Sequence, residues 1–438
     1  MTDHRFIIDP PAMRDPHLVV MLSGWIDASG AAAAAMAALE SDCEARPIRR
    51  RSRGSAIRLA NPTSRVDRAH RLRFQRSKGE PTVATPRADC GSASTVGAMK
   101  VDGMLSNSLR SAGEQAENLE AAGYSGVLTA ETNHDPFLPL ALAAERTSDI
   151  ELLTSIAVAF ARNPMTLANT AWDLQALSHG RFILGLGSQI KPHITKRFSM
   201  PWSHPAPRMR DLILAIRAIW DNWLNGTPLQ FRGEFYSHTL MTPFFAPPAA
   251  DLDGFGVPKV LLAAVGSLMT EVAGEVCDGI VCHGFTTERY LREVTLPALE
   301  RGRAKAGKTL AGFEVAGPFF VVTGGNEAER EAAVTGTRQQ IAFYGSTPAY
   351  RPVLELHGWG ALQDDLNQLS KAGEWERMGE LIDDEVLGTF AVLADEPEDI
   401  APKLHERFGD VVSRVAFGAP YQKDPERWRA VLDAVKAI

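Results

Sequence analysis

The sequence has few cysteines and no long apolar run. Its four cysteines, Cys43, Cys90, Cys277 and Cys282, are scattered and never form a CxxC pair, so we expect reduced, mostly buried thiols and no metal site. No stretch approaches the roughly 20 apolar residues that cross a bilayer. The N-terminus lacks the charged-then-apolar layout of a secretory signal. We therefore expect a cytoplasmic protein with no membrane partner.

Several signatures of other enzyme classes are also missing. The sequence contains no HExxH, no GxxxxGK[ST] and no serine-hydrolase order of residues, which argues against zinc hydrolase, P-loop and serine hydrolase chemistry. Of the 46 Lys+Arg and 53 Asp+Glu, residues 1–98 hold 15 and 10, which leaves 31 and 43 for residues 99–438. The main body is acidic, so nucleic acid is not an expected partner.

Residues 1–48 begin like an α/β unit. An apolar run at Leu18–Leu22 predicts a strand, Gly24–Gly30 a turn, and the alanine-rich Ala31–Leu39 a helix. The run LVVMLSGWIDASG resembles the first strand and turn of the proteasome-assembly-chaperone family, which has a similar Gly-Trp-x-Asp-Ala turn. The likeness covers only the first strand and helix, so we interpret residues 1–48 as a truncated fragment of that kind.

Residues 49–98 lose this pattern. They carry 12 Lys+Arg against 3 Asp+Glu and keep no helical or strand period, so they cannot bury enough apolar surface to order themselves. We interpret them as a basic, disordered linker. A basic arm that docks on a polyanion and a frame-shifted or read-through stretch are the alternatives.

From Met99 onward, short apolar runs alternate regularly with helical segments. This order predicts an α/β fold, a (β/α)8 TIM barrel in residues 99–438, with a doubly wound open sheet as the competitor. Two excursions, Thr227–Pro258 and Gly345–Gly388, exceed the eightfold pattern and are expected to be βα-loop insertions. The strand candidates are Lys100–Met104, Gly126–Ala130, Glu151–Val158, Phe182–Leu186, Val260–Ala264, Gly279–Cys282, Glu314–Val322 and Val411–Phe417.

Three blocks in a fixed order link the third and fourth strand candidates. Arg162-Asn163-Pro164 opens an alanine-rich helix, Ser178-His179-Gly180-Arg181 turns into the next strand, and GRFILGLGSQIKPH follows. This part of the chain resembles the luciferase-like monooxygenase (LLM) family, in its branch of coenzyme F420-dependent oxidoreductases. The likeness continues through AETNHDPFLPLALAAERT and RMRDLILAIRAIWDNW, and covers residues 99–438.

The resemblance implies that F420 binds at the carboxyl-terminal mouth of the barrel. The deazaflavin ring would lie against a bulge with a cis peptide bond at Ser155-Ile156. Glycines at the ends of strands let backbone N–H groups approach an anion, although they can equally serve only to turn the chain. The predicted cofactor-binding residues are Glu131, Thr132, Ser155, Ile156, Gly185, Gly187, Ser188, Gln189, Val265, Gly266 and Ser267.

The usual catalytic side chains of this family are replaced here. Many members carry an Asp-His pair after the second strand, where this chain has Glu131 and Thr132, with His134 just beyond. A Gly-Glu pair after the glycine nest is replaced by Gln189 and Ile190, and His193 follows. Glu131, His134 and His193 are therefore the catalytic candidates. Capping or packing is the alternative role for each histidine.

The resemblance implies hydride transfer between F420 and a small organic substrate. An FMN-dependent monooxygenase on the same barrel is the first alternative, and a non-catalytic assembly protein, suggested by the N-terminal fragment, is the second. Members of the family are commonly dimers, so a homodimer is expected.

Overall fold

The structure, a computed structural model, describes residues 99–106, 108–421 and 424–438. The predicted chaperone-like fragment and the basic linker lie outside the described residues, so both stay predictions. Among the helices that are described, none has the length and apolar character needed to cross a membrane.

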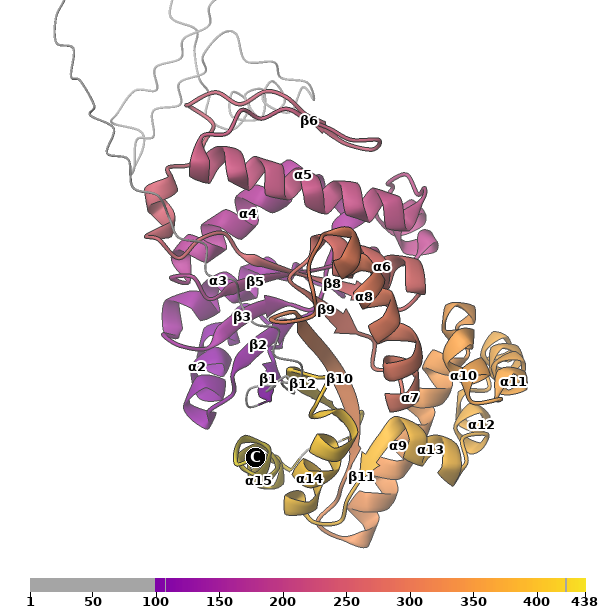
Figure 1. Ribbon diagram of the computed structural model, residues 1–438. Helices are drawn as coiled ribbons and strands as arrows, with labels where there is room; N and C mark the ends of the chain where they lie inside the picture. Colours follow the sequence, from indigo (N-terminus) through magenta and orange to yellow (C-terminus); the bar gives the residue numbers. More distant parts are fainter. Residues whose placement is uncertain (1–98, 107, 422–423) are drawn as a thin grey trace, which may run out of the picture. The chain divides into compact units, whose positions relative to one another are not determined.

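Eight parallel strands close into a barrel (Figure 1). The strand β1 pairs with β2 on one side and with β12 on the other, and β9 pairs with both β8 and β10. The predicted TIM barrel is thereby confirmed, and the open sheet is excluded because the barrel strands leave no edge. The barrel strands are β1 (Lys100–Met104), β2 (Gly126–Thr129), β3 (Glu151–Thr154), β5 (Phe182–Gly187), β8 (Lys259–Ala264), β9 (Gly279–Cys282), β10 (Glu314–Val322) and β12 (Arg414–Gly418).

Helices alternate with these strands and pack around the barrel. Local sequence sets where they begin: the Asn163 side chain accepts the Thr166 N–H at the start of α4, and Asp424 caps α15. Large side chains such as Trp172 and Trp220 are buried where α4 and α5 face each other. These helices are α2 (Ala112–Ala122), α3 (Phe137–Arg146), α4 (Pro164–Leu177), α5 (Pro205–Asn225), α6 (Ser267–Val276), α8 (Leu296–Lys305), α14 (Pro397–Phe408) and α15 (Pro425–Lys436).

The first excursion, residues 227–258, contains the short hairpin β6 (Phe231–Arg232) and β7 (Ser237–His238). It follows helix α5 and precedes strand β8, so it connects a helix to a strand. The prediction that it is a βα-loop insertion is therefore wrong. The carboxylate of Asp211, in the first half of α5, accepts the N–H groups of Phe235 and Tyr236 at 2.7 and 3.0 Å. These bonds hold the hairpin against the first half of α5.

The second excursion lies between β10 and α14 and is a βα insertion, as expected. The strand β11 (Ala391–Leu393) extends the sheet along the end of β10, and the insertion helices share a second hydrophobic cluster with Phe285 and Phe320, from the ends of β9 and β10. Figure 1 shows α10, α11 and α12 gathered at one side of the barrel. The helix α9 (Glu327–Gly345) leads into the predicted excursion, whose helical elements are η6 (Pro348–Tyr350), α10 (Arg351–Leu356), α11 (Gly360–Ala372), α12 (Trp375–Glu380) and α13 (Asp384–Phe390), which runs two residues beyond the predicted end.

The inward side chains of the strands form three layers, because alternate residues of a strand point to the same face. The middle layer is apolar and includes Leu128, Leu153, Ile183, Leu261 and Val281. The layer nearest the amino-terminal ends is charged. Two residues further along each strand, the layer at the carboxyl-terminal ends consists mostly of small residues, and this layer forms the mouth of the barrel.

The charged layer centres on Arg414, which is 1% exposed. Its Nη1 donates to Asp102 at 2.7 Å, its Nη2 donates to Glu151, and its Nε lies 3.4 Å from Glu314. Lys100 donates to Glu151 at 2.8 Å. One buried guanidinium thus joins carboxylates from three strands and closes the amino-terminal end of the barrel.

The pH dependence of stability should report this layer. Burial raises the pKa of Asp102 to about 6, against the attraction of Arg414. The stabilising contribution of Asp102 is therefore complete below its unfolded pKa and is lost as pH rises through about 6. Urea unfolding of wild type and Asp102→Asn at pH 5 and pH 7 should show wild type losing more stability than the variant between these values. Parallel losses would contradict the raised pKa.

Candidate functional site

The mouth of the barrel is lined by short side chains that solvent reaches. Ala130, Ser155, Ala263 and Gly418 are partly exposed, whereas the outward neighbours Thr129 and Thr154 are buried. Since inward and outward residues alternate, this exposure comes from the inside of the barrel. The carboxyl-terminal ends of the strands therefore present accessible backbone and little side-chain bulk, as expected for the ligand-binding face of this fold.

Two of the predicted glycines lie where neighbouring strands pack closely. A Cβ on Gly185 would lie 1.8 Å from the carbonyl oxygen of Thr154, and a Cβ on Gly187 would lie 2.8 Å from the side chain of Ile156. The Thr154 hydroxyl also bonds both the N–H and the C=O of Gly185, at 2.9 and 2.8 Å. Strand packing thus explains why position 185 is a glycine, whether or not a ligand binds there.

The Ser155-Ile156 peptide bond is cis, as the resemblance implies. It lies directly after β3, and the Ile156 carbonyl accepts the N–H of Glu131 from the end of β2 at 3.2 Å. Ser155 and Ile156 are partly exposed. The predicted positions Glu131, Ser155, Ile156 and Gly187 are therefore neighbours at the mouth.

Gly266 differs from the two strand glycines. It is the N-cap residue of α6, with φ −78° and ψ 149°, and no side chain caps this helix end. A Cβ on Gly266 would meet no atom within 4 Å, and Gly266 and Ser267 are both exposed. The first N–H groups of α6 are therefore open to an anion from solvent.

The turn after β5 uses its polar side chains locally. Gln189 has a left-handed backbone (φ 58°), and its side-chain oxygen accepts the N–H of Ile190 at 3.0 Å. The Ser188 hydroxyl donates to the Gln189 carbonyl at 3.1 Å. These bonds shape the turn, so the side chains of Ser188 and Gln189 are engaged within it.

The carboxylate of Glu131 is held by the protein itself. It accepts the N–H of Val158 at 2.7 Å and Nη1 of Arg162 at 2.6 Å, and its side chain is 6% exposed. Arg162 also bonds Asp135 at 3.1 Å. This geometry suits Glu131 to positioning the strand ends, and leaves less support for its predicted role as a proton donor.

The two predicted histidines lie on different mouth loops. His134 is exposed in the loop after β2, and His193 is exposed at the start of the short helical turn η3 (His193–Arg197). Arg197 of that turn donates to the carbonyl of Thr132, so the loops after β2 and β5 are joined. Neither histidine is buried or held in a defined orientation.

Replacing Glu131 with glutamine should therefore affect structure first. We expect the free energy of unfolding to fall by about 1–3 kcal/mol, because the buried acceptor of Arg162 loses its charge. Asp135→Asn is the matched control, since Asp135 bonds the same guanidinium from an exposed position; its cost should stay below about 1 kcal/mol. Chemical denaturation measures both, and equal costs would show that the burial of Glu131 is unimportant.

A histidine that the sequence analysis did not select also lies at the mouth. His283 follows Cys282 directly after β9, and the inward-facing Val281 places it in the same inward series. Its Nδ1 accepts the Phe285 N–H at 3.0 Å, and its Nε2 lies 3.1 Å from the hydroxyl of Tyr350. Continuing the strand alternation one step past GIVC would have identified His283; Tyr350 required the tertiary structure.

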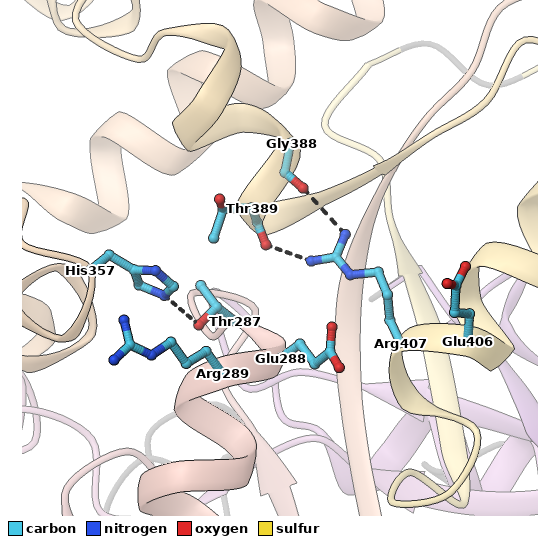
Figure 2. Close-up of a pocket in the computed structure, with 8 residues that line it drawn as sticks. All are labelled: Thr287, Glu288, Arg289, His357, Gly388, Thr389, Glu406 and Arg407. Atoms are coloured by element: carbon cyan, nitrogen blue, oxygen red, sulfur yellow. Dashed lines mark hydrogen bonds between the residues drawn. The ribbon is translucent and has the colours of Figure 1, made fainter.

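A cavity of about 620 Å³ opens elsewhere, among α7 (Glu288–Tyr290), α13 and α14 (Figure 2). The Arg407 guanidinium is already bonded to the carbonyls of Gly388, Thr389 and Ala391, and Thr287 bonds His357 at 2.8 Å. The Arg407 bonds tie the insertion to α14, and the Thr287–His357 bond ties it to the start of α7. None of the predicted site residues lines this cavity.

Metal binding has no support in the described part of the chain. No group of three or more His, Cys, Asp or Glu there could hold a metal ion. Cys277 and Cys282 are buried free thiols, as predicted for the cysteines, and burial raises the pKa of the Cys282 thiol to about 12. Cys43 and Cys90 lie outside the described residues.

Sequence comparison links the chain to known proteins. Residues 84–414 match the family model described as luciferase-like monooxygenase. An uncharacterized protein of Mycobacterium tuberculosis is 58% identical over 72% of this chain and 92% of its own length. The 5,10-methylenetetrahydromethanopterin reductase of Archaeoglobus fulgidus is 24% identical over 69% of this chain and 87% of its own length.

Structure comparison gives the same fold. The coenzyme F420-dependent tetrahydromethanopterin reductase of Methanopyrus kandleri superposes with a TM-score of 0.62 at 21% identity, and the match covers 77% of this chain and 97% of that one. At this identity the likeness concerns the barrel and its connections.

Proposed function

The chain belongs to the luciferase-like monooxygenase family, and from that premise we propose that it is an oxidoreductase that binds coenzyme F420 at the barrel mouth. Its substrate would be a small organic molecule, and the reaction a hydride transfer. The proposal depends on two features occurring together: small residues line the barrel mouth, and no side chain caps the amino end of α6.

The residues present suit a flat, tailed cofactor. Ala130, Ser155, Ala263 and Gly418 leave room beside the strand ends for a ring system, and Ile156 packs over Gly187 as an apolar surface. An apolar lining with few polar groups is typical of cofactor sites. Ser155 and Ile156 would therefore hold the ring.

The tail phosphate would bind at Val265, Gly266 and Ser267. Unpaired N–H groups and the helix dipole both favour a negative charge there, and Gly266 lets the anion approach closely. When bound, F420 supplies two-electron hydride chemistry. The protein's own task is to orient the ring and substrate and to provide a proton.

Cofactor titration of the full chain tests this proposal. We expect F420 fluorescence and absorbance to change on binding, with weaker binding of FMN. Tight binding of FMN together with oxygen consumption and no binding of F420 would overturn the proposal in favour of the monooxygenase alternative. Binding of neither cofactor would favour the non-catalytic assembly alternative.

Gly266→Ala separates anion binding from folding. A methyl group there meets no protein atom but narrows the approach to the N–H groups, so we expect the Kd for F420 to rise about tenfold, equivalent to about 1.4 kcal/mol. Unfolding free energy should change by no more than about 1 kcal/mol. Gly388→Ala, where an added methyl also meets nothing within 4 Å, is the control and should leave the Kd unchanged. An unchanged Kd in Gly266→Ala would remove the phosphate assignment.

Two further properties accompany this proposal. The chain is expected to form a homodimer, which sedimentation of the purified protein would test. A screen of organic compounds, followed through F420 absorbance, would identify the substrate.

A further inference from the structure

His283 is a polar ring among the small residues of the mouth. The inward residues of β9 are Gly279 and Val281, and the next inward position is His283. Val281 pairs with Ala263 of β8 and Ala316 of β10, so the next inward positions of those strands are Val265 and Pro318. His283 is partly exposed, so it borders the space that the mouth leaves to ligands.

The hydrogen bonds of His283 define its tautomer. The Phe285 N–H donates to Nδ1 at 3.0 Å, so Nδ1 carries the lone pair and the neutral ring carries its hydrogen on Nε2. Burial lowers the pKa of His283 to about 4, which keeps the ring neutral at pH 7. Nε2–H therefore donates to the hydroxyl oxygen of Tyr350 at 3.1 Å.

This arrangement leaves the proton of the Tyr350 hydroxyl available. The oxygen accepts from His283, so its own O–H must donate to another group, and no acceptor for it is found among the described residues. Burial raises the pKa of Tyr350 to about 12, so the hydroxyl is protonated at pH 7. Tyr350 is partly exposed and lies at the end of η6, in the insertion that follows β10.

We infer that Tyr350, oriented by His283, donates a hydrogen bond and then a proton to the oxygen or nitrogen of a neutral carbonyl or imine substrate. The inference rests on the proposed function, which supplies the hydride. Tyr350 is the catalytic residue in this assignment, and His283 is a positioning residue that acts through it.

The proposed step balances. The hydride that reduced F420 would supply forms a C–H bond at the substrate carbon. The π electron pair of the C=O or C=N bond moves onto the oxygen or nitrogen, and that atom takes the proton of Tyr350. The substrate leaves as an alcohol or amine. The resulting phenolate is stabilised by the Nε2–H bond from His283 and recovers a proton from water, so His283 itself remains neutral.

The charges around the mouth favour a neutral substrate. The charge of Arg162 is compensated by the carboxylates of Glu131 and Asp135. His283 and Tyr350 are neutral donors, which suit a carbonyl oxygen better than a carboxylate or phosphate. The recognised chemistry is therefore one hydrogen-bond acceptor on an otherwise apolar molecule.

The test compares wild type, Tyr350→Phe and Tyr344→Phe. The ring of Tyr344 packs edge-on to His283 with centroids 4.6 Å apart, so it matches Tyr350 in burial and neighbourhood, but of these two tyrosine hydroxyls only that of Tyr350 bonds His283. Each protein is loaded with reduced F420 and offered acetone, cyclohexanone, benzaldehyde and pyrroline, with benzoate as the matched anion. F420 affinity is measured separately by fluorescence.

We expect wild type to reduce at least one neutral compound and not benzoate. Tyr350→Phe should lower kcat by about 10²-fold or more, the usual contribution of a general acid, while KM and the Kd for F420 change less than about twofold. Tyr344→Phe should stay close to wild type. Equal losses in the two variants, or a loss confined to KM, would overturn the role of Tyr350.

A readout independent of activity tests His283. NMR of the ring nitrogens should show the Nε2–H tautomer at neutral pH in wild type, with the Nε2 signal shifted in Tyr350→Phe; an Nδ1–H tautomer would overturn the orientation. If wild type binds F420 but reduces no neutral carbonyl or imine, the substrate class is wrong. If wild type does not bind F420, the proposed function fails, and the titration reports that separately.

Discussion

Replacing Arg414 with methionine is expected to lower the free energy of unfolding by about 3–5 kcal/mol, the usual cost of removing one partner from a buried ion pair. Arg414 is the shared partner of Asp102, Glu151 and Glu314. Methionine has a similar length but no charge, so the buried carboxylates would repel one another without a counterion. The barrel end that these side chains close would then lose its main electrostatic support.

Urea denaturation followed by circular dichroism measures this loss. Arg429→Met is the control, because Arg429 pairs with Asp433 on the helix surface, where both side chains are more than half exposed. Exposed pairs of this kind contribute about 0–1 kcal/mol. A cost for Arg414→Met as small as that of the control would contradict the account of the charged layer.

Replacing Gly185 with alanine is expected to destabilise the protein by about 3 kcal/mol, at the upper end of overpacking costs. The added Cβ would lie 1.8 Å from the carbonyl oxygen of Thr154. That obstacle is backbone, so relief requires β3 and β5 to separate. Separation would also break the two bonds between the Thr154 hydroxyl and Gly185.

Gly187→Ala is the matched control on the same strand. Its Cβ would lie 2.8 Å from Cδ1 and Cγ1 of Ile156 and 3.6 Å from the Cβ of Ala263. The close contacts are with a side chain that can change rotamer, so the cost should be about 1 kcal/mol. Thermal and urea unfolding of both variants would compare them. The packing explanation for Gly185 fails if Gly187→Ala is the more destabilised of the two.

The barrel strands were predictable because each is a short apolar run between helical segments. β1, β9 and β10 have the predicted bounds, whereas β12 begins at Arg414 instead of Val411. The apolar pair Val411-Val412 lies just before β12 and looks like the start of the strand in the sequence. Arg414 looks like a polar interruption, although it is buried and is the first residue of the strand. The short β11 was missed, since its three residues form a strand only by pairing with β10.

The candidate site was predictable in part. The sequence pattern located Ser155, Ile156, Gly187 and Gly266 near strand ends, and these ends do meet at the mouth. It could not reveal that Glu131 is held by Arg162 and Val158, because such a bond depends on how two loops fold against each other. The pairing of His283 with Tyr350 spans 67 residues and escaped any local pattern for the same reason.

The sequence by itself determined the eightfold alternation, the family and the positions where backbone lies without side-chain bulk. These properties depend on residues close together in the chain, whose spacing sets hydrophobic periodicity and turn geometry. Only the tertiary structure decided which charged groups neutralise one another and which polar groups keep a free hydrogen. Asp102 and Arg414 lie 312 positions apart and meet because the barrel closes, and closure depends on packing across the whole chain.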